Sequence, residues 1–237
     1  MPSNKPIDEK EMKTERTPLK DRPFPDYSRR EEICNSASHA AGVLCALAMT
    51  GIAVHTATAN PKPWSLFSSI VYSVAILAMF LFSSIYHGLP KGLPKQVMRV
   101  VDHCNIFFTI AGTYTPIMLL GVLPVNPTMA WAVLAVEWGF GLIGIILNAI
   151  DLKKYAKFSM VCYLAMGWCV IISLRDAISG MTWSGFAWIL AGGVAYTVGA
   201  ALYLIGKKKP YRHFLFHLFV FLAAILQFYG IWKYLLV

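Results

Sequence analysis

Long apolar stretches separated by short polar connections run along the chain from about residue 33 to its end. Seven of these stretches are about as long as the roughly 20 apolar residues that a helix needs to cross a bilayer. Their expected bounds are 36–59, 64–86, 100–123, 128–150, 158–174, 183–205 and 213–237. The pattern predicts an all-α membrane protein, a bundle of seven transmembrane helices in one domain that spans residues 33–237.

The first 32 residues have a different composition. They hold eight basic residues, eight acidic residues and five prolines, with few large apolar side chains. A segment of this kind cannot bury enough apolar surface to fold, so residues 1–32 are predicted to form a disordered cytoplasmic tail. No apolar core follows a short basic start within this segment, so a cleaved secretion signal is not expected.

Composition also favours lipid over water as the environment of the chain. Hydrophobic residues make up 57% of the sequence and charged residues 14%, whereas soluble domains contain about 45–50% and about 25%. The five cysteines are odd in number and lack C-x-x-C spacing, so no disulfide framework is expected. The net charge of +9 could indicate a nucleic-acid partner, but the basic residues flank the apolar stretches, so none is predicted.

Lys and Arg are distributed unequally between alternate connections. Eighteen lie in the tail and in the second, fourth and sixth connections, and three lie on the other side. Because basic residues stay in the cytoplasm, we expect a multi-pass protein of the cell membrane with the amino terminus inside and the carboxyl terminus outside. The densest cluster, which could also bind anionic lipid head groups, consists of Lys207, Lys208, Lys209 and Arg212.

Several ionisable residues share one depth in this topology. His87 ends the second span, Asp102 opens the third, and His213 and His217 open the seventh. Ionisable residues inside spans are costly and are typical of functional sites. The two histidines four positions apart share a helical face, about 6 Å apart along the axis. Three neutral imidazoles suit a tetrahedral zinc ion with a fourth position for water, as in catalytic zinc sites.

Two interpretations of these residues are open from spacing alone. In the first, Asp102 orients or deprotonates the water, and Ser83 hydrogen-bonds the water or a developing oxyanion. In the second, the histidines are interfacial and Asp102 caps the third helix. Near the same face are three further polar residues, which could shape the site or cap and solvate the first helix: Glu32, Asn35 and His39.

Glu137 is a separate case, because it lies near the middle of the fourth span without a basic residue at comparable depth. It should be protonated or face a polar cavity. A cavity wall, a protonatable switch and a neutral carboxyl group between helices are all open, and Glu137 is not assigned to the core site.

Five motifs carry a resemblance to a known family. They are Glu32-x-x-Asn35-x-x-x-His39-x-x-Gly42, Ser83-x-x-x-His87, Asp102-His103, Ala111-Gly-Thr-Tyr-Thr-Pro116 and His213-x-x-x-His217. In their order and spacing, from about Glu31 to the carboxyl terminus, the chain resembles the bacterial hemolysin III proteins. That family is similar to the adiponectin and progestin receptors and, more distantly, to alkaline ceramidases.

The resemblance implies a seven-helix bundle with the amino terminus inside, in agreement with the charge distribution. It also implies that zinc is bound at His87, His213 and His217, and that Asp102 and Ser83 match water-contacting residues. Relatives are linked to the hydrolysis of lipid amides. We therefore expect a zinc-dependent membrane hydrolase whose partner is a lipid or a lipid-like substrate, with no oligomeric state implied.

Two other functions are weighed against hydrolysis. In one, the protein is a receptor-like membrane protein in which zinc only braces the helices. In the other, it is a membrane-perturbing hemolysin, as the family name implies. A released pore-former needs a soluble state, which this hydropathy does not provide, so the hemolysin ranks third.

Overall fold

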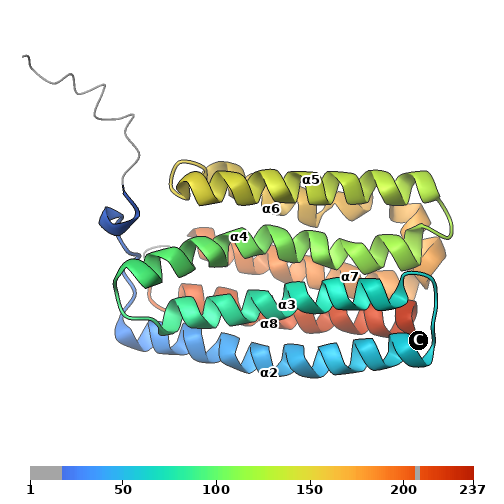
Figure 1. The fold of residues 1–237 in the computed structure, drawn as a ribbon, viewed down its shortest axis with the longest axis horizontal. Coiled ribbons are helices and arrows are strands. Elements are labelled where there is room, and N and C mark those ends of the chain that lie inside the picture. The colour runs from blue at the N-terminus through green and yellow to red at the C-terminus, as the bar shows by residue number, and fades with distance from the viewer. Residues whose placement is uncertain (1–17, 206–208) are drawn as a thin grey trace, which may run out of the picture.

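The computed structural model describes residues 18–205 and 209–237, and all regular elements in these ranges are helical. Its six long helices lie side by side with their axes nearly parallel (Figure 1). They are α2 (Arg29–Ala59), α3 (Ser65–Gly88), α4 (Leu93–Pro116), α5 (Pro127–Asp151), α7 (Leu174–Ile205) and α8 (Arg212–Ile231). The shorter elements are η1 (Leu19–Asp21), η2 (Ile117–Val122), α6 (Ala156–Gly167), η3 (Cys169–Ile171) and η4 (Trp232–Leu236).

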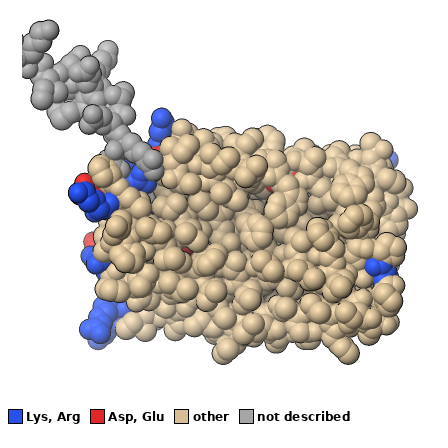
Figure 2. Space-filling model, viewed as in Figure 1, with Lys and Arg blue, Asp and Glu red and all other residues tan. Residues whose placement is uncertain are grey.

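Six helices in the described ranges are long and apolar enough to cross a membrane. Large apolar side chains cover the flanks of the bundle, such as Leu44 and Ile172, which are 70% and 69% exposed. Lys and Arg gather at one end of the visible face, and little charge interrupts the surface between the ends (Figure 2). An apolar belt of this kind is stable only in lipid, so the protein is a multi-pass integral membrane protein.

The fifth predicted span differs most from the structure. In place of one helix over 158–174, the short helix α6 is followed by the 3₁₀ turn η3, and together they cover only Ala156–Ile171. The hydroxyl of Tyr114 donates to the carbonyl of Gly167 and accepts from the amide of Val170 at 2.7 Å. A side chain from α4 therefore satisfies backbone groups at the point where the helix breaks.

Helix α2 begins before the predicted end of the tail. Ser28 is its N-cap and forms a reciprocal capping box with Glu31, so Arg29 already lies in the helix. Residues 29–32, which the sequence analysis placed in the tail, therefore lie in α2, and the Ser28-x-x-Glu31 pattern is the sequence signal for this helix start. Residues 1–17 of the predicted tail lie outside the described residues, as do Lys207 and Lys208 of the basic cluster.

Helix α4 packs between α3 and α5 and is the most buried of the candidate spans. Its threonine hydroxyls donate to backbone carbonyls one turn earlier, as Thr113 does to the Thr109 carbonyl at 2.8 Å, so their polar groups are satisfied without water. Pro116 lacks an amide proton, and the helix continues from it into the π-helical segment η2. The chain thus stays helical through the motif that contains this proline.

Helix α2 packs against both α3 and α8. Close approach of α2 to α3 requires the glycine at position 42, because a Cβ atom there would lie 2.2 Å from the ring of Phe80. This packing brings the first turns of α2, the last turn of α3 and the first turns of α8 to the same end of the bundle (Figure 1). Residues far apart in sequence meet there.

Candidate metal centre

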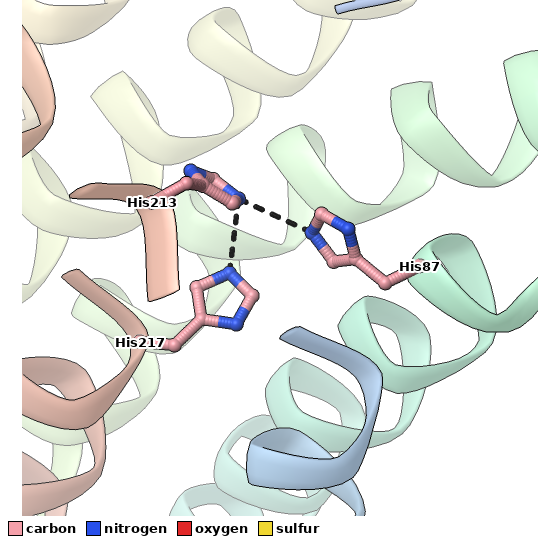
Figure 3. A group of neighbouring side chains, drawn as sticks. All are labelled: His87, His213 and His217. Atoms are coloured by element: carbon pink, nitrogen blue, oxygen red, sulfur yellow. Dashed lines mark hydrogen bonds between the residues drawn. The ribbon is translucent and has the colours of Figure 1, made fainter. Parts of the chain in front are cut away.

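Three histidine side chains meet at this end of the bundle (Figure 3). His87 lies in the last turn of α3, whereas His213 and His217 lie one turn apart at the start of α8. The Nε2 atom of His213 is 3.2 Å from Nε2 of His87 and 3.0 Å from Nε2 of His217. Each ring therefore directs one nitrogen toward a common point, and among the described residues this is a group that could hold a metal ion.

The separations of these nitrogens fit a tetrahedral zinc ion. Zn–N bonds of about 2.0–2.1 Å place two ligand nitrogens about 3.3 Å apart in a tetrahedron. A neutral imidazole carries one ring proton, so its Nε2 atom presents a lone pair when the proton is on Nδ1. Three lone pairs facing one another repel unless a cation lies between them, and the donor set therefore suits the ion.

Hydrogen-bond partners behind two of the rings favour this tautomer. The Nδ1 atom of His87 lies 2.6 Å from Oε2 of Glu32, and Nδ1 of His217 lies 3.3 Å from the backbone carbonyl of Asn35. Both acceptors require a proton on Nδ1 and leave Nε2 free. Metal-binding histidines commonly donate their second nitrogen to a carboxylate or a backbone carbonyl in this way, which fixes the ring orientation.

Lys95 is a residue of this site that the sequence analysis missed, since it was counted only as a loop charge. Its side chain is buried, and Nζ lies 3.0 Å from Oε1 of Glu32. The same Nζ donates to the carbonyls of Tyr86 and Leu89, each at 2.9 Å, at the end of α3. Cations commonly bind the last carbonyls of a helix, and a lysine shortly after a predicted helix end was the available signal.

Ser83 and Asp102 lie beside the histidines on α3 and α4. Their side chains share a hydrogen bond, and both line a cavity that His213 and His217 also line. The Asp102 carboxylate is 3.7 Å from Nδ1 of His103, which instead lies 2.8 Å from the Arg99 carbonyl. Asp102 therefore faces the shared cavity with Ser83 as its neighbour.

The cavity has a volume of about 770 Å³ and is mostly apolar, which is within the range of small-molecule sites. It extends from His217 to Gln227, ten residues further along α8, or about 15 Å along the helix axis. Trp168 and Val220 are among the residues that line its deeper part. The arrangement joins a polar end to a long apolar space.

The N-terminal residues near this site act on it in different ways. His39 is 3% exposed, its ring centroid is 3.8 Å from that of His217, and neither nitrogen has a hydrogen-bond partner in the described part of the chain. Glu31 accepts a hydrogen bond from the amide of Tyr211 at 2.8 Å, which ties the start of α2 to the turn before α8. Tyr27 stacks on His213 at a centroid distance of 5.0 Å.

Other candidates lie away from this cluster. Glu137 is fully buried and does not line the cavity, and its carboxyl group interacts with Cys169. His55 is exposed. All five cysteines fall within the described ranges and are free thiols. The expectation that the chain lacks a disulfide framework is therefore confirmed.

The sequence model of one protein family, described as haemolysin-III related, matches residues 27–228. Hemolysin-3 of Bacillus cereus is 30% identical over 87% of this chain and 93% of its own length. The Hemolysin-3 homolog of Bacillus subtilis (strain 168) is 31% identical over 88% of this chain and 96% of its own length. The human Monocyte to macrophage differentiation factor is 28% identical over 73% of this chain and 72% of its own length.

Proposed function

This chain belongs to the haemolysin III-related family of membrane proteins, and from that premise we propose that it is a zinc-dependent hydrolase of a lipid amide. The zinc ligands are His87, His213 and His217. The convergence of their three Nε2 atoms, 3.0 and 3.2 Å apart, at the polar end of an apolar cavity carries the proposal. A metal ion bound there would lie at the end of a cavity large enough for part of a lipid.

The residues around the histidines have distinct tasks in this reaction. Zinc held by these histidines would supply a Lewis acid and would lower the pKa of a bound water toward about 7. The Asp102 carboxylate accepts a proton from the water that attacks the amide carbon, and it then returns the proton to the leaving amine nitrogen. The Ser83 hydroxyl orients this carboxylate. Glu32 and the Asn35 carbonyl hold protons on Nδ1 of His87 and His217.

The shape of the cavity supports a position for the substrate in this proposal. The apolar part of the cavity holds the acyl chain of the substrate, so that the substrate amide group lies between Asp102 and the histidines.

We further propose that the chain crosses the membrane seven times with its amino terminus in the cytoplasm, and that α6 and η3 form the fifth passage. The basic residues at the histidine end of the bundle support this orientation (Figure 2), which puts the reaction near the inner face of the cell membrane.

One observation also supports a non-catalytic zinc brace. The histidines come from α3 and α8, and Glu32 extends the cluster to α2, so a bound ion would tie three helices together. A receptor-like protein needs no more than this. The presence of Asp102 and Ser83 on the same cavity favours catalysis, because a brace has no use for a carboxylate and a hydroxyl directed at the cavity.

Turnover distinguishes the two functions. Purified protein containing one zinc should hydrolyse a long-chain N-acyl amide, lose this activity on chelation and regain it with added zinc. The Asp102→Asn variant should keep its zinc and lose about 100-fold or more in kcat, as expected for loss of a general base. Zinc-loaded wild type that hydrolyses no member of a lipid-amide panel, but melts at lower temperature after chelation, would support the brace.

A further inference from the structure

The polar end of the cavity carries more positive charge than the proposed reaction uses. Arg99, Lys153 and Lys157 line the cavity, and within the described ranges none of them forms an ion pair. We refer to these three residues as the basic mouth. Lys153 and Lys157 are exposed, and a cytoplasmic position alone would account for exposed lysines.

Arg99 requires a further explanation because part of its guanidinium group is buried. Its Nη1 atom donates to the Pro23 carbonyl at 3.0 Å, whereas Nε is buried and has no hydrogen-bond partner among the described residues. A buried donor without a partner destabilises the folded protein, and more so when it is charged. A guanidinium that lines a cavity is suited to a carboxylate or a phosphate, which it can bind through two parallel hydrogen bonds.

Two tyrosines near this guanidinium add neutral donors. Tyr27 and Tyr86 line the cavity, and both lie close enough to Arg99 to interact with its charge. Burial raises the pKa of Tyr27, so its hydroxyl stays protonated and can donate a hydrogen bond. The surroundings of Arg99 therefore resemble an anion site with one cation and neighbouring hydroxyl groups.

The carboxylates of the cavity compensate only part of its positive charge. Among the described lining residues the acidic side chains are Asp102 and Asp151. Asp151 is 3.7 Å from Arg22, and Asp102 is hydrogen-bonded to Ser83. Four basic side chains, Arg22 and the three of the basic mouth, thus share the described lining with two carboxylates, and this excess of positive charge attracts an anion from outside the described chain.

We propose that the basic mouth binds an anionic head group of the substrate, so that the enzyme prefers anionic over neutral lipid amides. This inference rests on the proposed hydrolase function and specifies its substrate class. Arg99 and Asp102 are three residues apart on α4 and so are neighbours on the helix surface, about 5–6 Å apart at Cβ. The anionic group therefore lies within a few bonds of the amide nitrogen, as in an N-acyl amino acid.

A matched pair of substrates tests the preference. N-palmitoylglycine and N-palmitoylethanolamine have the same chain and differ in the charge of the head group. Wild type should show at least about a tenfold higher kcat/KM for the glycine compound, with the difference mainly in KM. Arg99→Gln should remove most of this preference, and Arg99→Lys should retain part of it.

Two further variants separate head-group binding from misfolding. Lys157 is exposed, so Lys157→Gln should fold normally and reduce the preference by a smaller factor. Lys154→Gln is the matched control, because Lys154 is also exposed and next to Lys153 but does not line the cavity. This control should have wild-type kinetics for both substrates.

The outcomes distinguish this inference from the function on which it rests. Equal kcat/KM for the two compounds, or an undiminished preference in Arg99→Gln, would overturn the head-group assignment while leaving the hydrolase intact. Hydrolysis of neither compound would instead count against the hydrolase, and a binding experiment would then test the head-group assignment.

In that experiment, native mass spectrometry should show hexadecyl phosphate, but not hexadecanol, bound to wild type, and hexadecyl phosphate should not bind to Arg99→Gln. If hexadecyl phosphate and hexadecanol bind equally, and millimolar inorganic phosphate binds at Arg99 in their presence, the site takes free anions and the head-group assignment is overturned.

Discussion

The hydrogen bond between Glu32 and His87 allows a quantitative test of how α2 supports the metal site. In the Glu32→Gln variant, the carboxylate that accepts from Nδ1 of His87 at 2.6 Å becomes a neutral amide of nearly the same shape. The amide oxygen can still accept the proton. The variant therefore removes the charge of the acceptor without removing the acceptor, and it leaves the three histidines unchanged.

The expected magnitude follows from the nature of this bond. Hydrogen bonds to charged groups contribute about 1.5–3 kcal/mol and neutral ones about 0.5–1.5 kcal/mol, so the loss is about 1–1.5 kcal/mol. The Glu32 side chain is 19% exposed, so solvent screens the pair only in part. A loss of this size weakens zinc binding by roughly tenfold, at the lower end of the range for partners behind metal ligands.

Zinc affinity can be measured by competition with a chelator of known affinity in detergent. Glu31→Gln is the matched control, because Glu31 is the preceding residue and contacts Ser28 and the Tyr211 amide rather than a histidine. Glu32→Gln also deprives the buried Lys95 of its charged partner, so the melting temperature of the zinc-free protein should be recorded as well. Equal zinc affinity in wild type and Glu32→Gln, or an equal loss in Glu31→Gln, would refute the role of Glu32.

Two other predictions concern stability. Gly42→Ala should lower the melting temperature in detergent, because its Cβ atom would lie 2.2 Å from the Phe80 ring and overpacking typically costs about 1–3 kcal/mol. The control is Gly51→Ala, where a Cβ atom meets nothing within 4 Å. An equal shift of the melting temperature in both variants would contradict the close packing of α2 on α3. Zinc removal by a chelator should lower the melting temperature of wild type and leave that of His217→Ala unchanged, whereas an equal shift in both proteins would place the metal elsewhere.

Much of the fold could be predicted from the sequence because lipid imposes a strong constraint. Every spanning segment must be long and apolar, so hydropathy located the six long helices. It could not locate the break between α6 and η3, because that break depends on the Tyr114 hydroxyl of a different helix. Helix α7 begins at Leu174, the last residue of the predicted fifth span, whereas the predicted sixth span begins at residue 183, directly after the non-helical Thr182.

The candidate site could be predicted in part from the sequence, also because of a geometric constraint. Two histidines four positions apart must share a helix face, so His213 and His217 could be paired from spacing, and their common depth suggested His87. Spacing could not show which partners hold the rings. The contact of Glu32 with His87 and the burial of Lys95 depend on how α2 and α3 pack together, and tertiary packing of this kind leaves no periodic signal in the sequence.

The central claim is that three histidines hold one zinc ion. Elemental mass spectrometry of detergent-purified protein tests it most directly, with wild type compared with His87→Ala, His213→Ala and, as a control histidine away from the cluster, His55→Ala. We predict about one zinc per chain in wild type and His55→Ala, and almost none in the other two variants. Folded wild-type protein without zinc, even after zinc is supplied, would contradict the account, as would zinc that persists in both cluster variants.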